Sequence, residues 1–167
     1  MKVTDKHVFF WGEWPSNWYP CIFNAEYEGK EYTFYNSEQY FMFVKAKTFG
    51  DEENALKLLL EGKNPKKAKT YGRMVRNYDD EKWNEIRYQV MVDANMAKYS
   101  QNDELKNLLL SDEFNGKGFV EASPIDGVWG IKCSEEDALD DESNWNGQNL
   151  LGKALDEVRD RLMNVKI

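Results

Sequence analysis

The side chains that could do chemistry in this 167-residue chain are carboxylates, amides, cations and indoles. Carboxylates activate water or stabilise a cationic sugar carbon, indoles stack on flat bases, and Arg or Lys binds phosphate. This mixture suits a phosphorylated sugar that carries a base. The candidates are Glu38, Glu121, Asp126, Asn17, Asn149, Lys45, Arg73, Lys98, Trp18 and Trp129.

The composition argues against several other chemistries. His7 is the only histidine, and Cys21 and Cys133 are widely separated with no CxxC spacing. This weakens a zinc site or a His-based triad and favours free thiols. The sequence also contains no phosphate-binding loop, dinucleotide glycine fingerprint or nucleophile elbow. We expect no metal and no cofactor.

Glu38 falls in the first turn of a helix expected over residues 36–46, which Asn36 or Ser37 can cap. The helix is apolar almost all round and must pack on several sides. Lys45 lies seven residues on and shares the face of Glu38. An acid entering a buried helix is costly unless it is paired. Two interpretations are open: an acid favoured by the helix dipole, or a carboxylate held at a pocket wall.

Asp126 precedes Gly127 in a turn expected between strands over 119–122 and 128–131. It is therefore either a turn residue or a second catalytic carboxylate. The loop over residues 12–20 holds Trp18, Tyr19 and Asn17 between prolines. Exposed loops seldom carry so many aromatic residues, so this loop either folds back onto the core or lines a site.

The net charge of −8 argues against a general nucleic-acid binder. Residues 63–76 nevertheless contain six cations and no acid. Its lysines suit a solvated helix surface, whereas Arg73, directly after Gly72, suits a bidentate phosphate contact. Lys98 lies beside the buried stripe of the longest expected helix, and either snorkels to water or serves a site.

The elements expected around these residues indicate an α+β fold. We expect a single helix-rich domain over residues 1–167 with a small antiparallel sheet. Strands are expected at 7–11, within a hairpin at 22–34, and at 119–122 and 128–131. Helices are expected at 51–62, with Leu56, Leu59 and Leu60 as core residues, and at 65–72, 80–99, 103–109 and 150–162. We expect residues 134–144 to form a solvated acidic loop. Neither a membrane-spanning run nor a signal peptide is present, so we expect a cytoplasmic protein.

Five segments resemble, in order, the signatures of the NADAR (YbiA-like) family. They are residues 16–20 (SNWYP), 37–41 (SEQYF), 72–73 (GR), 121–130 (EASPIDGVWG) and 146–152 (NGQNLLG). The resemblance extends from about residue 9 to residue 162. It implies a compact α+β domain and N-glycosidase chemistry. Family members hydrolyse the bond between ribose 5-phosphate and the aminopyrimidine of early riboflavin-pathway intermediates, and others are linked to ADP-ribose or NAD-derived substrates.

The resemblance places Glu38 on the acid of the family's SE-x-Y-F motif, and Asp126 and Trp129 on its D-x-x-W-G motif. We expect Glu38 to act at the anomeric carbon, as a base that orients water or by stabilising an oxocarbenium-like transition state. Asp126 is expected to hydrogen-bond ribose hydroxyls or to share the acid/base role. The expected substrate-binding residues are Asn17, Tyr19, Lys45, Arg73, Lys98, Trp129 and Asn149, with Trp129 stacking, the amides fixing hydroxyls or base edges, and the cations receiving phosphate.

The alternatives are an ADP-ribosyl hydrolase acting on a modified nucleobase or an NAD-derived metabolite, and a non-catalytic ADP-ribose-binding module. The partner is in each case a small phosphoribosyl or ADP-ribosyl molecule, and nucleic acid only if the substrate is an ADP-ribosylated base. Two departures from the family affect substrate identity. Gln39 stands where many members have His, and the acidic stretch 134–144 is long. The oligomeric state is not predicted.

Overall fold

The computed structural model describes residues 1–164, whose contacts form two compact units. The central unit is Asn17–Asp103, and the terminal unit is Met1–Ser16 together with the chain from Glu104 on. Each unit is described by itself. The expectation of one domain over residues 1–167 stays a prediction.

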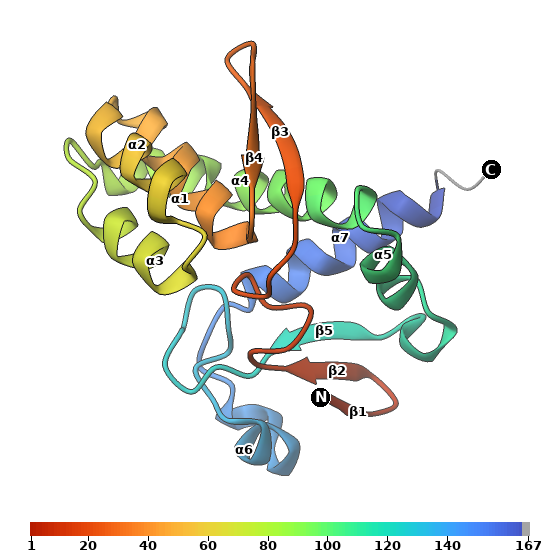
Figure 1. The fold of residues 1–167 in the computed structure, drawn as a ribbon. Helices are drawn as coiled ribbons and strands as arrows, with labels where there is room; N and C mark the ends of the chain where they lie inside the picture. Colours follow the sequence, from red (N-terminus) through yellow and green to blue (C-terminus); the bar gives the residue numbers. More distant parts are fainter. Residues whose placement is uncertain (165–167) are drawn as a thin grey trace. The chain divides into compact units, whose positions relative to one another are not determined.

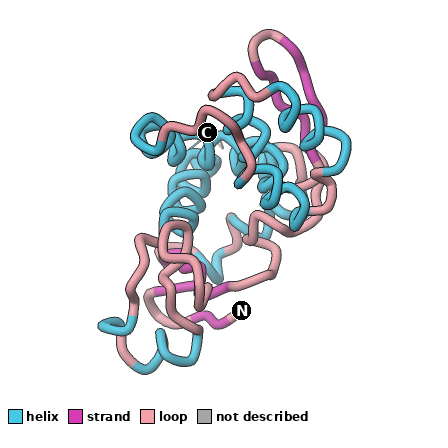
Figure 2. The backbone as a smooth tube through the Cα atoms, turned by 90° about the vertical axis from the view of Figure 1, so that its left-hand side faces the viewer, coloured by secondary structure: helices cyan, strands magenta, loops and turns pink. Residues whose placement is uncertain are grey.

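The central unit begins with the predicted β-hairpin, formed by β3 (Phe23–Tyr27) and β4 (Lys30–Phe34). Figure 2 shows its two strands as a separate pair. Its turn places Glu28 and Gly29 at φ 49° and 80°, which the glycine adopts without strain. One face of the hairpin is aromatic and packs on the next helix: the Phe34 ring centroid lies 5.2 Å from that of Tyr40 and 5.4 Å from that of Phe43.

Helix α1 (Ser37–Thr48) is surrounded by the other helices of the central unit, as its apolar sequence predicts. It packs against α2 (Glu52–Glu61), α3 (Pro65–Arg73) and α4 (Asp80–Ser100), and its start contacts β4 (Figure 1). The predicted capping residues Asp51 and Asn64 accept hydrogen bonds from the first turns of α2 and α3. The predicted helix starts and stops are therefore confirmed to within one or two residues.

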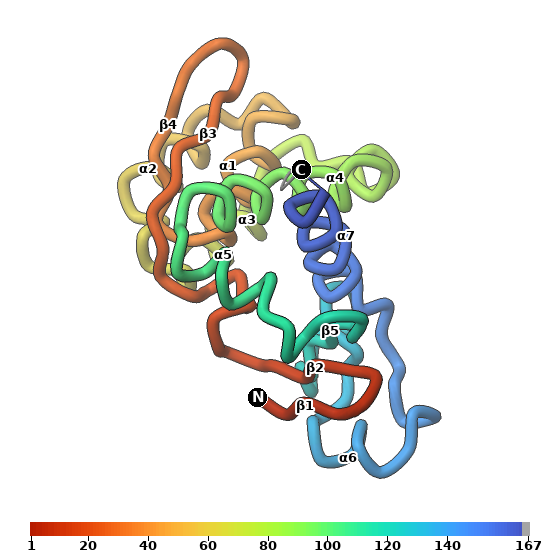
Figure 3. The backbone as a smooth tube through the Cα atoms, turned by 90° about the vertical axis from the view of Figure 1, so that its right-hand side faces the viewer, coloured from red at the N-terminus to blue at the C-terminus, as the bar shows by residue number. Residues whose placement is uncertain are grey.

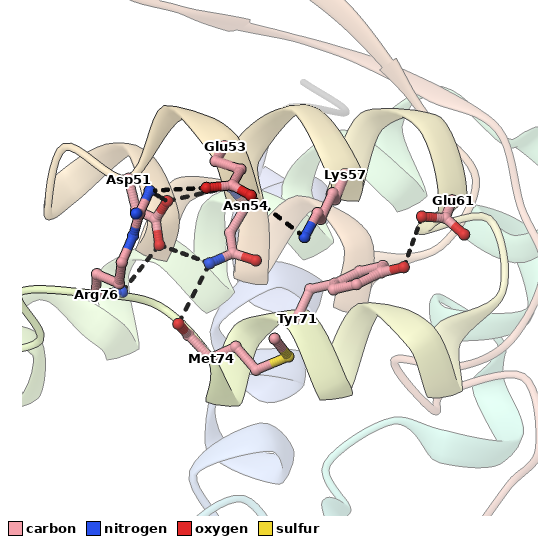
Figure 4. A network of polar contacts seen from close by, with 8 residues as sticks. All are labelled: Asp51, Glu53, Asn54, Lys57, Glu61, Tyr71, Met74 and Arg76. Atoms are coloured by element: carbon pink, nitrogen blue, oxygen red, sulfur yellow. Dashed lines mark hydrogen bonds and ion pairs between the residues drawn. The ribbon is translucent and has the colours of Figure 1, made fainter.

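The predicted core face of α2 is wrong. Leu56 and Leu60 are 56% and 73% exposed, while the buried residues of this helix are Asn54, Ala55 and Leu58. The buried stripe starts with polar side chains, because Asp51 and Asn54 join a hydrogen-bond network with Arg76 and the Met74 carbonyl (Figure 4). A hydrophobic pattern cannot identify a face whose first turn is buried through hydrogen bonds.

The terminal unit contains a three-stranded sheet in the order β1–β2–β5. Strand β1 (Lys2–Val3) pairs antiparallel with β2 (His7–Phe10), and β2 pairs parallel with β5 (Gly118–Glu121). The expected antiparallel arrangement therefore fails for one pairing. The unit also contains α5 (Asp103–Leu109) from Glu104 on, a 3₁₀ turn (Asp112–Phe114) and α7 (Leu150–Asn164), which packs along β5 (Figure 3).

Two further expectations in this unit are wrong. Residues 128–131 form no strand, because the backbone N–H groups of Val128 and Trp129 donate to the Asp126 side chain and their carbonyls accept from the start of α7. Residues 134–144 are not a plain loop. They form α6 (Glu135–Asp140), capped by Ser134, and a 3₁₀ turn (Glu142–Asn144). A serine before three acids is a helix-start signal.

The fold class is confirmed: the chain is a helix-rich α+β protein with small sheets. Cys21 and Cys133 are both free thiols, as expected. Within residues 1–164, none of the helices has the length and apolar character needed to span a bilayer. The cytoplasmic location stays a prediction.

Candidate active site

Glu38 lies in the first turn of α1 and is only 8% exposed. Its backbone N–H donates to the Asn17 carbonyl at 3.1 Å, so the aromatic loop is attached to the start of α1. Asn17 is buried, and its Oδ1 has no hydrogen-bond partner among the described residues. Tyr19, two residues on, is 38% exposed. The loop therefore buries an amide beside the turn that carries Glu38 and leaves an aromatic ring at the surface.

Glu38 is coupled electrostatically to Lys45, and Lys45 is coupled to Arg73. Burial lowers the pKa of Lys45, the negative charge of Glu38 opposes this, and the positive charge of Arg73 adds to it. The Lys45 Nζ lies 4.6 Å from the centre of the Tyr78 ring. These couplings place one carboxylate and one further cation within electrostatic reach of Lys45, a combination that suits a phosphorylated sugar.

Arg73 owes its place to a close helix contact. It is in the last turn of α3, exposed, directly after Gly72. A Cβ at Gly72 would collide with the Met42 Sδ of α1, so a larger residue there would have to displace the Met42 side chain from between the two helices. The guanidinium therefore stands at the end of a helix that is fixed against α1.

Lys98 is fully buried, so the snorkelling interpretation is wrong. Its Nζ lies 5.0 Å from the ring centre of Tyr99 and 5.8 Å from that of Tyr19. Burial lowers its pKa to about 8, against the effect of a negative charge at Cys21, which would raise it. Near neutral pH the group is mostly an ammonium, and it loses its charge in mildly alkaline solution.

In the terminal unit, Asp126 is a turn residue with fixed geometry. Its Oδ1 accepts from the N–H groups of Val128 and Trp129 at 2.8 and 2.9 Å, and its own N–H donates to the Ser123 Oγ. The turn interpretation is therefore confirmed. The catalytic role of Asp126 stays a prediction. Because Oδ1 already accepts two backbone hydrogen bonds, that role would fall to the second carboxylate oxygen, Oδ2.

Asn149 connects the start of α7 to strand β5. Its Oδ1 accepts from the Glu121 N–H at 3.0 Å and its Nδ2 donates to the Phe119 carbonyl at 2.9 Å. Its φ of 53° is left-handed, and a Cβ at the neighbouring Gly152 would collide with the Phe119 carbonyl. The amide retains one N–H and one lone pair for any ligand. Trp129 is partly buried.

The structure therefore groups six expected site residues in the central unit and three in the terminal unit. Asn17, Tyr19, Glu38, Lys45, Arg73 and Lys98 belong to the first group, and Asp126, Trp129 and Asn149 to the second. A hollow of about 500 Å³ described in the terminal unit is lined by the β1–β2 turn, α6 and residues around Trp145, and contains none of them. The assignment of these nine residues to one substrate stays a prediction.

Two buried polar side chains near these residues were not predicted from the sequence. Gln39, noted only for replacing His, is fully buried with hydrogen bonds at both ends of its amide. Asp156 of α7 accepts from the Phe119 N–H, and burial raises its pKa to about 6. The long-range contacts have no local sequence signal, because Gln39 reaches the Leu58 carbonyl 19 residues away and Asp156 reaches the Phe119 N–H 37 residues away. Among the described residues no three His, Cys, Asp or Glu side chains group as metal ligands.

The elements and side chains define a helix-rich α+β protein whose candidate site is made of carboxylates, amides and cations. Comparisons with known proteins agree. The NADAR domain model matches residues 9–163. The NMR structure of the E. coli protein YbiA superposes with a TM-score of 0.74 at 26% identity, covering 99% of this chain and 89% of that one.

Two relatives are more similar in sequence. A protein of Acanthamoeba polyphaga mimivirus that is named an N-glycosidase is 38% identical over 167 residues, covering 94% of this chain and 96% of the relative. The protein irg-1 of Caenorhabditis elegans is 38% identical over 160 residues, covering 88% of this chain and 74% of its own length. The chain belongs to the NADAR domain family. The expected enzyme class, an N-glycosyl hydrolase, is supported by the same similarity.

Proposed function

We propose that this protein hydrolyses the N-glycosidic bond of a phosphoribosyl-aminopyrimidine, an early riboflavin-pathway intermediate, and releases ribose 5-phosphate. Water adds to the anomeric carbon, the bond from that carbon to nitrogen breaks, and the leaving amine takes up a proton. The observation that carries the proposal is the buried carboxylate of Glu38, which is electrostatically coupled to Lys45, whose charge is in turn coupled to that of Arg73.

Glu38 acts at the anomeric carbon, where it orients the water or stabilises the developing positive charge. Lys45 and Arg73 neutralise the phosphate, and Lys98 is a third cation for the same role. Asn17, whose buried Oδ1 has no partner among the described residues, fixes a hydroxyl or a base edge beside Tyr19. Each of these residues belongs to the central unit.

For the terminal unit we propose roles for Asp126, Trp129 and Asn149. Asp126 binds ribose hydroxyls or shares the acid/base role through its second oxygen, Trp129 stacks on the base, and Asn149 contributes its remaining N–H. Substitution tests these roles: Asp126→Asn keeps an oxygen that accepts from Val128 and Trp129, so loss of turnover in this variant measures the charge and not the turn.

The test is incubation of the purified protein with a phosphoribosylaminopyrimidine, with chromatographic detection of ribose 5-phosphate. ADP-ribosylated guanine and NAD are assayed in parallel. We expect release from the phosphoribosylaminopyrimidine at the highest kcat/KM. Release of ADP-ribose alone would reject the proposed substrate, and ADP-ribose binding by calorimetry without any product would favour the binding module.

One observation favours the second candidate, an ADP-ribosyl hydrolase. Lys66, Lys69 and Arg73 are three and four residues apart on α3, so they share one face, and none forms an ion pair among residues 1–164. The Lys69 Nζ lies 6.0 Å from the ring centre of Trp18, which is 41% exposed. This face suits a second phosphate with an aromatic ring beside it. The double variant Lys66→Gln/Lys69→Gln should weaken turnover of ADP-ribosylated substrates only.

A further inference from the structure

Two buried amide side chains flank Glu38 at the start of α1. Asn36 is 1% exposed and Gln39 is fully buried. Both use the carbonyl oxygen and the NH₂ group of the amide, so each connects two parts of the backbone. A helix start needs only one acceptor at its N-cap, so this arrangement does more than cap the helix.

Asn36 performs two tasks with the two halves of its amide. Its Oδ1 accepts from the Gln39 N–H at 2.7 Å, which is the N-cap contact. Its Nδ2 donates to the carbonyls of Gly62 and Lys63 at 3.0 and 3.2 Å. Those carbonyls lie where α2 has ended and α3 is about to begin. The second task therefore connects the turn of Glu38 to the start of the helix that carries Arg73.

Gln39 makes a parallel connection from the other side of Glu38. Its Oε1 accepts from the Tyr35 N–H at 2.8 Å, and its Nε2 donates to the Leu58 carbonyl at 2.9 Å. A Cβ at Gly62 would come within 2.7 Å of the Gln39 Cγ, so the end of α2 has no side chain where Gln39 passes. The last turn of α2 is thus built around this amide.

We infer that Asn36 and Gln39 are positioning residues for the reaction, holding the Glu38 turn in fixed register with α2 and with the start of α3. The inference rests on the proposed role of Glu38. Catalytic geometry is sensitive to small shifts, and a displacement of about 1 Å costs about 100-fold in rate. Asn36 and Gln39 take no part in the chemical step, and they determine the position of the Glu38 carboxylate.

Asn36→Ser tests this, because serine caps a helix as well as asparagine but cannot reach the two carbonyls with an NH₂ group. With a phosphoribosylaminopyrimidine as the probe, we expect kcat to fall about 10- to 100-fold and KM to change less than about threefold. Gln39→Met, which keeps the side-chain volume and removes both hydrogen bonds, should act in the same direction and serves if the first variant fails to fold.

Arg159→Gln is the matched control. Arg159 is a buried residue of the terminal unit that also donates to two backbone carbonyls, those of Phe114 and Lys117 at 3.1 and 2.6 Å. We expect this variant to lose at least as much thermal stability as Asn36→Ser with an unchanged kcat. An unchanged kcat in Asn36→Ser, or a fall no larger than in the control, would overturn the inference.

A second measurement needs no turnover. The pH titration of the Glu38 carboxyl carbon by ¹³C NMR reports the surroundings of that group directly. We expect its midpoint to move in Asn36→Ser and to stay in Arg159→Gln. A wild-type protein that releases no ribose 5-phosphate would reject the proposed function and leave this titration to decide on positioning. An unmoved midpoint would reject positioning even in an active enzyme.

Discussion

Glu38 is a carboxylate kept in an otherwise apolar helix, and three features make that possible. It stands in the first turn of α1, where the helix dipole favours negative charge. Its charge is coupled to that of Lys45 on the same helix. Its backbone N–H is satisfied by the Asn17 carbonyl. The dipole and catalytic interpretations are therefore compatible: the contacts that stabilise the ionised acid also keep it available for work at a cationic carbon.

The first prediction is that Glu38→Gln nearly abolishes turnover while the fold persists. Glutamine has the same shape but neither base strength nor charge, and a positioned acid or base contributes about 10²- to 10⁴-fold in rate. Ribose 5-phosphate release and thermal melting measure the two effects. Glu53→Gln, on the exposed side of α2, is the control and should keep full activity. If Glu38→Gln retains most of the activity, the assignment of Glu38 is wrong.

The second prediction concerns the pH dependence of phosphate binding. Burial lowers the pKa of Lys98 to about 8, so its ammonium is present below pH 8 and lost as the pH rises through that value. If Lys98 receives the phosphate, KM should be level below pH 8 and should rise towards about tenfold per pH unit well above it. Steady-state kinetics from pH 6.5 to 9.5 measure this. A KM that stays constant to pH 9.5 would remove Lys98 from the phosphate site.

At the residue scale, the sequence predicted what depends on neighbours in the chain. Asn36 as a cap, Glu38 in the first turn and Asp126 as a turn residue all follow from spacing over a few positions. The burial of Lys98 and the second task of Asn36 do not, because they depend on partners brought together only by the fold. The Gly62 carbonyl is 26 residues from Asn36, and no pattern in the sequence around Asn36 predicts the hydrogen bond between them.

At the scale of elements, helix ends were predictable and helix faces less so. Capping side chains mark where α1, α2 and α3 begin, and Gly50 and Gly62 mark the ends of α1 and α2, whereas Gly72 lies within α3. The buried face of α2 begins with Asp51 and Asn54, so the leucines that seemed to mark its core are exposed. The parallel pairing of β2 with β5 joins strands more than 100 residues apart. The sequence of neither strand predicts which strand it pairs with.

The third prediction tests the polar stripe of α2. Burial disfavours ionisation of Asp51, but hydrogen bonds from Arg76 and Asn54 outweigh it and hold the pKa of its carboxyl well below the usual range. A depressed folded pKa gives stability that is complete above pH 4 and is lost as the pH falls through the folded value. Asp51→Asn keeps the cap but lowers the free energy of unfolding by about 1–3 kcal/mol at pH 7.

The difference in the free energy of unfolding between wild type and Asp51→Asn should shrink as the pH falls below about 4. Protonation then removes the negative charge of Asp51 from the wild type, and the substitution has already removed it from the variant. Urea unfolding at pH 3, 5 and 7 measures it. Glu52→Gln, at an exposed position in the same first turn, is the control. A difference that is the same at all three pH values would show that the charge of Asp51 contributes nothing.

The fourth prediction concerns the segment that leads into α7. A Cβ at Gly147 would collide with the Gly130 carbonyl and come within 2.7 Å of the Ile131 carbonyl carbon, and these backbone atoms cannot rotate away. Gly147→Ala should therefore lower the free energy of unfolding by about 1–3 kcal/mol. At Gly118 the nearest contact is an ordinary 3.6 Å, so Gly118→Ala is the control. Equal stability of the two variants in urea would contradict the close approach.

At the scale of the whole molecule, the sequence contained the fold class and the family but not the substrate. The fold class follows from the number and type of helices and strands, so one wrongly predicted element does not change the predicted class. The substrate depends on which phosphates and which base the site accepts, and that is decided by a few side chains. The ADP-ribosyl candidate carries a second phosphate and an adenosine that the phosphoribosyl candidate lacks, and α3 offers cations for one phosphate or two.

The last prediction follows from the charge inventory of the molecule. A carbon–nitrogen bond to an aminopyrimidine breaks when the leaving nitrogen is protonated, and the ribose carbon is stabilised by a carboxylate, so neither event needs a Lewis acid. Magnesium often neutralises phosphate in enzymes, but here Lys45, Arg73 and Lys98 are assigned that task. Exhaustive treatment with a chelator should therefore leave kcat/KM within about twofold, with the chelator saturated by magnesium as the control. If activity is lost and added Mg²⁺ restores it, a metal ion neutralises the phosphate in place of these side chains. The roles of all three cations would then have to be reassigned.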